Sequence, residues 1–104
     1  MAAKLRLVAH PTFKAAVDIP VPGTGPVPVV FEFKHRTKDG LVEFIRSADG
    51  LPDEQTVLAV ATGWDMDEAF TAENVATFLQ NYLGAAHAIV EAYMRELAQA
   101  KLGN

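Results

Sequence analysis

The feature that most constrains the fold of this chain is a change in the spacing of its apolar residues. Between residues 13 and 34, apolar and polar side chains alternate, and this period of two is typical of half-buried strands. The apolar positions of the two alternating runs are Phe13, Ala15, Val17 and Ile19, then Val29, Phe31 and Phe33. After residue 37 the spacing changes to about 3.6 residues, the period of an amphipathic helix. The chain therefore combines strands with helices, and the strands come first.

The two strand-like runs are separated by residues 20–28, which contain four prolines and two glycines. Proline cannot donate a hydrogen bond to a strand ladder, and glycine permits a positive φ. We therefore predict a β-hairpin over residues 13–35 with a long, stiffened loop at its tip. An isolated hairpin is only marginally stable in water, so helices are expected to cover its aromatic face.

Four helical segments are predicted after the hairpin. Thr37, Asp53 and Thr71 are suitable N-caps for the first three, and the fourth spans about 85–101. The second is predicted to run as far as Trp64 with an interruption at Gly63. The apolar stripes, in order, are Leu41, Phe44, Ile45 and Ala48; Val57, Val60, Ala61 and Trp64; Val75, Phe78, Leu79 and Tyr82; and Ala86, Ile89, Val90, Tyr93 and Leu97.

These segments predict an α+β fold, with an N-terminal β-hairpin packed on a bundle of about four helices and a helix-rich C-terminal half. The length of 104 residues suits one domain. We expect a single domain over residues 1–104, made of a lead-in segment 1–12, the hairpin 13–35 and a helical part 37–102.

Charge and composition argue against several classes of protein. Aspartate and glutamate outnumber lysine and arginine by 13 to 9, and a nucleic-acid-binding face is usually basic. No apolar run approaches the roughly 20 residues that span a bilayer. The first residues form a poor signal peptide because no long apolar stretch follows their positive charges. The chain has no cysteine, which fits a reducing compartment. We expect a cytoplasmic protein that binds neither nucleic acid nor membrane.

No catalytic, cofactor-binding or metal-binding motif is found in the sequence. Ser47 is the only serine and does not lie in a Gly-x-Ser-x-Gly turn. The three histidines are far apart, and the acidic cluster at residues 65–68 lacks the later glycine and acidic ligand of a calcium loop. Gly23 and Gly25 lead into Pro26 and a strand rather than into the Gly-Lys-Ser/Thr of a phosphate loop. The basic run 34–38 is interpreted as a solvated junction. We therefore expect a protein without enzymatic activity.

Some apolar residues lie off the helical stripes, namely Val42, Leu58, Ala92, Met94 and Ala98. One interpretation is that a small α+β domain buries its helices on two sides. The alternative is a second apolar surface that accepts a partner helix or a neighbouring subunit.

Several short motifs resemble those of the tail assembly chaperones of tailed phages and prophages. They cover residues 13–104, and the chain departs from the pattern at Leu83, where we expect relatives to carry proline. The motifs are the proline- and glycine-rich hairpin followed by residues 30–37 (VFEFKHRT), then 63–65 (GWD), 70–75 (FTAENV), 81–86 (NYLGAA), 88–93 (AIVEAY) and the ending Gly103-Asn104.

The resemblance implies a non-enzymatic protein that binds the long, helical tape-measure protein and keeps it soluble and extended while the tail tube assembles. It implies action in the host cytoplasm, absence from the finished virion and self-association, with the tail tube protein as a second candidate partner. As partner-binding residues we predict Phe78, Tyr82, Tyr93, Met94 and Leu97, whereas Trp64 and Phe70 are expected to lock a connector. The alternatives are a small DNA-binding regulator or antitoxin, and a minor structural tail-completion protein.

Overall fold

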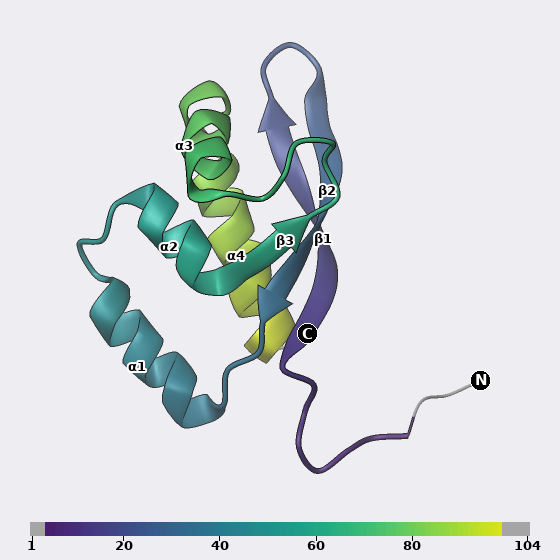
Figure 1. Ribbon diagram of the computed structural model, residues 1–104, viewed down its shortest axis with the longest axis vertical. Helices are drawn as coiled ribbons and strands as arrows, with labels where there is room; N and C mark the ends of the chain where they lie inside the picture. The colour runs from purple at the N-terminus through teal and green to yellow at the C-terminus, as the bar shows by residue number, and fades with distance from the viewer. Residues whose placement is uncertain (1–3, 99–104) are drawn as a thin grey trace.

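A computed structural model of the chain describes residues 4–98, and it contains three strands and four helices (Figure 1). The α+β class predicted from the sequence is confirmed. The elements are β1 (Thr12–Val21), β2 (Gly25–Lys34), α1 (Lys38–Ala48), α2 (Asp53–Val60), β3 (Ala61–Trp64), α3 (Ala72–Asn81) and α4 (Ala85–Ala98). The predicted helical residues 99–101 and the motif Gly103-Asn104 lie outside the described residues.

The strands form one antiparallel sheet in the order β1-β2-β3, and the helices cover one of its faces (Figure 1). The odd-numbered residues of the hairpin, such as Val17, Ile19, Phe31 and Phe33, are buried under the helices. The even-numbered residues of β1 from Lys14 to Pro20 are exposed. The alternation in the sequence therefore assigns each side chain to the face that it occupies.

The hairpin tip is much shorter than predicted, because the strands continue through most of the prolines. Only residues 22–24 form the turn, in which the Thr24 N–H donates to the Val21 carbonyl at 3.0 Å. Pro22 precedes Gly23, whose φ is +78°, and this order is typical of a type II turn. The prediction of a loop over residues 20–28 was wrong.

The register explains why prolines are tolerated in these strands. Val30, which is paired with Ala16, directs its N–H to the Asp65 carboxylate and its carbonyl to the Asp65 N–H, both 3.0 Å away. Even-numbered residues therefore point their backbone groups away from the other strand of the hairpin. Pro20, Pro26 and Pro28 share this parity, so their missing N–H groups remove no bond between β1 and β2.

The third strand replaces the end of the predicted second helix. Ala61 pairs with Phe33 and Trp64 pairs with Phe31, so β3 covers the outer edge of β2 at residues 31–33, past Pro26 and Pro28. The spacing of Val60, Ala61 and Trp64 also fits a helix, but the edge of β2 offers partners to the backbone of residues 61–64, and these residues pair there. Extension of α2 to Trp64 was therefore an incorrect prediction.

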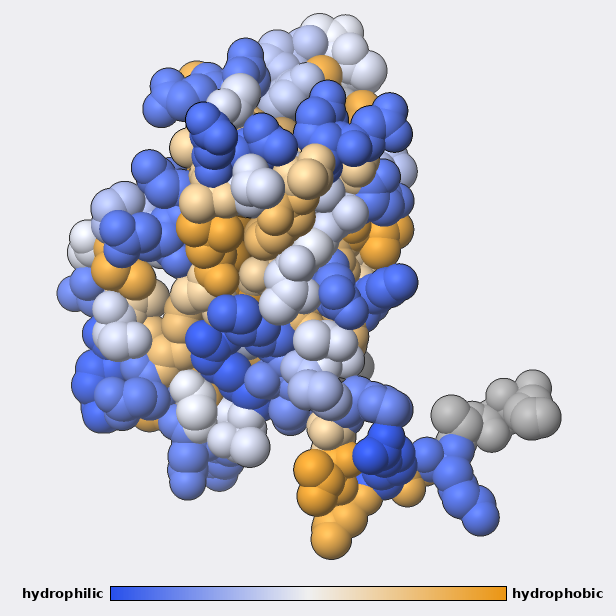
Figure 2. All heavy atoms as spheres, in the orientation of Figure 1, coloured by the Kyte–Doolittle hydropathy of each residue, from blue (hydrophilic) through white to orange (hydrophobic). Residues whose placement is uncertain are grey.

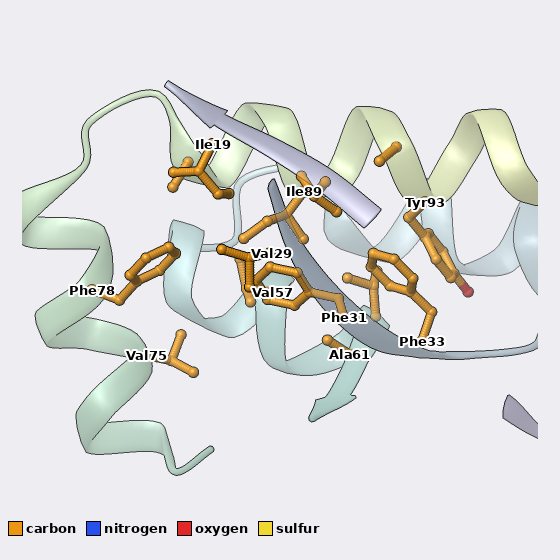
Figure 3. Packing of buried hydrophobic residues seen from close by; sticks show 14 of the residues in the cluster. Ile19, Val29, Phe31, Phe33, Val57, Ala61, Val75, Phe78, Ile89 and Tyr93 are labelled. Atoms are coloured by element: carbon orange, nitrogen blue, oxygen red, sulfur yellow. The ribbon is translucent and has the colours of Figure 1, made fainter. Parts of the chain in front are cut away.

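The core lies between the sheet and the helices α2, α3 and α4 (Figure 3). Its largest fully buried side chains are Tyr93, Phe31, Phe33 and Ile89, joined by valines of β1, α2 and α3. The rings of Phe33 and Tyr93 lie 5.3 Å apart, which connects the hairpin to α4. Ile45 was predicted on the buried stripe of α1, but half of its surface is exposed.

Candidate partner-binding site

One hollow on the described surface is a groove between α3 and the connector that follows β3. It has a volume of about 290 Å³, and a space-filling view shows apolar atoms in the middle of this face with hydrophilic atoms around them (Figure 2). The groove is lined by Trp64, Met66, Glu68, Asn74, Thr77, Phe78, Asn81 and Tyr82. We refer to these eight residues as the α3 groove.

The floor of the α3 groove is aromatic. The ring of Phe78 lies 5.4 Å from that of Trp64 and 5.3 Å from that of Tyr82, so the three rings form a continuous row. Phe78 is buried, whereas Trp64, Tyr82 and Met66 are half-buried and keep part of their surface open to solvent. Aromatic and methionine side chains of this kind are typical of protein-binding surfaces.

The connector wall of the α3 groove is fixed in place by Trp64. Its indole N–H donates to the Glu68 carbonyl at 2.7 Å, and the Phe70 ring contacts it edge-on at 5.0 Å. Asn74 adds a hydrogen bond from its side-chain amide to the Ala69 carbonyl at 2.8 Å. The structure thus gives Trp64 and Phe70 the connector role predicted for them, and it also exposes part of Trp64 in the groove.

The rim of the α3 groove is polar and carries one acidic residue, Glu68. Glu68, Asn74, Thr77 and Asn81 surround the aromatic floor. Eight acidic residues and no lysine or arginine lie between Arg46 and Arg95. With Glu68 on the rim and no lysine or arginine in the lining, the groove favours a partner that carries positive charge.

The structure brings two of the five predicted partner-binding residues together. Phe78 and Tyr82 lie in the α3 groove, whereas Met94 and Leu97 are half-buried near the far end of α4, beside the start of β1 (Figure 1). Tyr93 has no exposed surface, so it offers no contact area to a partner in this conformation. Its ring and hydroxyl instead hold elements of the fold together.

The predicted second apolar surface is also divided. Val42 of α1 is half exposed, Leu58 and Met94 are half-buried against the core, and Ala92 is buried. Met66, which lines the groove, was not among the predicted partner-binding residues, although its position between Asp65 and Asp67 indicates an apolar side chain near the surface.

Within residues 4–98, no three or more His, Asp or Glu side chains are grouped closely enough to hold a metal ion. None of the helices in this range combines the length and the apolar character needed to cross a bilayer.

Comparison with protein families adds a finding that covers the whole chain. A family model described as phage tail assembly chaperone matches residues 1–104. No curated protein and no solved structure matches the sequence.

Proposed function

The chain belongs to the phage tail assembly chaperone family, and from this premise we propose that it binds the helical tape-measure protein and keeps it soluble and extended until the tail tube assembles. The proposed role requires binding and no bond-making chemistry. It also includes action in the host cytoplasm, absence from the finished virion, self-association, and the tail tube protein as a second partner.

The observation that carries this proposal is the α3 groove, with its row of aromatic rings and its polar rim. An amphipathic helix binds by placing its apolar side chains in a hydrophobic groove. Such contacts are strongest where an aromatic pocket is shielded from water by a polar border. Trp64, Phe78 and Tyr82 supply the pocket, and Glu68 and Asn81 belong to the border.

The negative charge of Glu68 on the rim favours some partner helices over others. Consider a bound helix that places one apolar side chain in the groove. A lysine or arginine within one helical turn of that side chain would lie near Glu68 and be attracted by its carboxylate. We therefore propose that the bound tape-measure segments carry an apolar residue followed or preceded closely by a basic one. Met94 and Leu97 are retained as a second contact area for a longer helix.

A substitution in the α3 groove tests the proposal directly. Met66→Glu places a charge against the aromatic row, and Leu83→Glu is a matched control because Leu83 is 88% exposed outside the groove. We expect co-expressed tape-measure protein to lose solubility with the Met66 variant and to stay soluble with the Leu83 variant. A folded Met66 variant that keeps the tape-measure protein soluble would show that the groove is not the site.

The single tryptophan provides a second readout. Because Trp64 lines the groove, a bound tape-measure peptide should change its emission maximum or intensity. Met94→Asp distinguishes the α3 groove from the second contact area on α4. If Met94→Asp impairs binding and Met66→Glu does not, the tape-measure protein contacts α4. If neither variant changes binding, both assigned surfaces are wrong.

The remaining alternatives have their own tests. Arg36, from the basic run, is held by the Tyr93 hydroxyl at 2.9 Å and lies over the Phe44 ring, which argues against a free DNA-contacting role. A mobility shift at physiological salt would support the regulator alternative. Mass spectrometry of purified particles distinguishes a chaperone, which should be absent, from a tail-completion protein, which should be present.

A further inference from the structure

In the sheet order β1-β2-β3, the outer edge of β1 has no strand partner among the described residues, and its even-numbered residues before Pro20 keep their N–H groups. The His35 N–H donates to the Pro11 carbonyl at 2.8 Å, so odd-numbered residues of the first strand direct their backbone groups toward β2. The backbone groups of Lys14, Ala16 and Asp18 consequently point outward, where another strand can bind them.

The segment before β1 has the pattern of a strand without a partner. Leu5 and Leu7 are 99% and 102% exposed, and Lys4 and Arg6 alternate with them. Apolar atoms of this segment stand clear of the rest of the molecule at the lower edge of the view (Figure 2). Two leucines in full contact with water favour any arrangement that buries them on one face of a sheet.

We propose that two copies of this chain associate by strand addition, with residues 4–8 of each copy pairing antiparallel with the open edge of β1 in the other. The register that fits best places Leu7 opposite Val17, Leu5 opposite Ile19 and Arg6 opposite Asp18. The leucines then extend the apolar face of the sheet beside α4, which packs along β1. Arg6 and Asp18 form an opposite-charge pair on the open face, whereas a register that opposes Arg6 to Lys14 places like charges together.

This register is symmetric about Thr12, so both segments dock at the same time. Residue 7 pairs with residue 17 of the second copy and residue 17 with its residue 7, as a two-fold axis requires. Pro11 does not block the pairing, because its nitrogen and carbonyl point toward β2 rather than toward the new strand. The segment bends at Leu7 and Val8 in the single copy, and straightening it breaks the exposed contact of Arg6 with His10.

The occupant is a second copy rather than the same chain. The Pro11 carbonyl is held by His35, so the segment leaves the sheet along the direction of β1 instead of folding back onto its own edge. Phe13, Ala15 and Val21 are only half-buried, so the seam between β1 and α4 still has apolar surface to cover. The inference deepens the self-association of the proposed function, and its test uses the purified chain alone, so its failure leaves tape-measure binding untouched.

The test is the molar mass of the full chain in solution, measured by light scattering at several concentrations. We expect the mass to rise from the 11.2 kDa of one copy to about twice that value as concentration increases. The double variant Leu5→Asp, Leu7→Asp should stay at the mass of one copy. Leu83→Asp is the control, since it charges an equally exposed leucine outside the contact and should dimerise like the unmodified chain.

The acceptor edge is tested by Ala16→Pro. The Ala16 N–H points outward, so proline removes a bond to the second copy without removing one between β1 and β2. Circular dichroism checks that each variant is folded. Each variant alone should be monomeric, whereas mixing them should restore a dimer, because the intact segment of the Ala16 variant can pair with the intact edge of the leucine variant.

Three results would overturn the proposal. The first is a chain that stays monomeric at its highest soluble concentration. The second is a dimer that the two leucine substitutions leave unchanged. The third is a monomer in which the amides of Lys14, Ala16 and Asp18 are protected from hydrogen exchange at every concentration, since this would place the segment on its own β1.

Discussion

Tyr93 is the residue through which the hairpin, the start of the helical part and α4 are joined. Its hydroxyl donates to the Lys34 carbonyl at 2.8 Å and accepts from Arg36 at 2.9 Å. Its ring lies within 6.2 Å of the rings of Phe13 and Phe44. A polar atom buried in this way stabilises the fold only while both of its partners are present.

Tyr93→Phe tests the importance of this hydroxyl. The substitution keeps the ring but leaves the Lys34 carbonyl without its donor, so we expect the free energy of unfolding to fall by about 1–2 kcal/mol. A urea titration followed by circular dichroism measures the change. Tyr82→Phe is the matched control, because the Tyr82 hydroxyl makes no hydrogen bond within residues 4–98, and its effect should be much smaller. Equal losses from both variants would contradict the assigned role.

For single residues, the spacing predicted which apolar side chains share one face of a strand or helix, but not which of them are buried in the core. The burial of Phe31, Phe33 and Ile89 follows from their spacing. Tyr93 has the same spacing as residues proposed to contact a partner, and only the packing of the hairpin end against α4 decides that it is buried. Arg36 was interpreted as solvated, yet its guanidinium lies 4.4 Å from the centre of the Phe44 ring.

Among the elements, α1 is the one most weakly attached to the rest of the structure. Phe44 is its only buried residue, while Val42 and Ile45 on the same helix are half exposed. Thr37 caps its first turn by accepting from the Gly40 N–H, which stabilises the helix itself but not its attachment. The position of α1 therefore depends mainly on the insertion of the Phe44 ring beside Arg36 and Tyr93, with Leu41 and Ala48 only partly buried against the core.

Phe44→Ala should release α1 while the sheet and the other helices stay folded. Loss of a buried phenylalanine costs about 3–5 kcal/mol, and here the cost falls mainly on the docking of one helix. Hydrogen exchange should show the amides of residues 38–48 becoming unprotected while those of β2 and α4 remain protected. Val42→Ala is the control on the same helix and should change little. Equal loss of protection in all elements would show that α1 is part of the main cooperative unit.

The elements also show where sequence patterns stop being informative. The period of the apolar residues predicted the hairpin and the four helices, and Thr37 and Thr71 cap α1 and α3 as expected. Asp53, predicted as the cap of the second helix, is instead the first residue of α2, which follows Pro52 without a side-chain cap. The strand β3 was missed because four residues are too few to establish a period, and its formation depends on the free edge of β2. The length of the hairpin loop was wrongly predicted because a proline weakens a hairpin only where its missing N–H would have bonded to the other strand. Whether it does so depends on the alignment of the two strands, which the sequence pattern alone does not give.

For the molecule as a whole, the single-domain organisation remains a prediction that unfolding can test. One cluster of buried residues includes side chains from all three strands and all four helices. Such a core should unfold in one transition, so the fluorescence of Trp64 and the far-UV circular dichroism should share one urea midpoint. Two separated midpoints would indicate two independently stable parts.

The distribution of charge over the whole molecule leads to an expectation for tape-measure binding. The α3 groove carries Glu68 on its rim, and the stretch between Arg46 and Arg95, which supplies all of its lining, contains no lysine or arginine, although the net charge of the chain is only −4. Attraction between this surface and a basic helix is screened by salt, because the Debye length falls from about 30 Å at 0.01 M to about 3 Å at 1 M. Binding of a tape-measure peptide, followed by Trp64 emission, should therefore weaken as salt increases, mainly through slower association.

The apolar part of the contact should persist at high salt, because burial of the aromatic row does not depend on charge. Glu68→Gln removes one rim charge without changing the shape of the groove, so this variant should bind more weakly at low salt and show a smaller salt dependence. Met66→Glu should instead lose affinity at every salt concentration. If affinity is independent of salt in both the unmodified chain and the Glu68 variant, the rim charge has no part in choosing the partner, and recognition depends on the shape and apolar character of the groove alone.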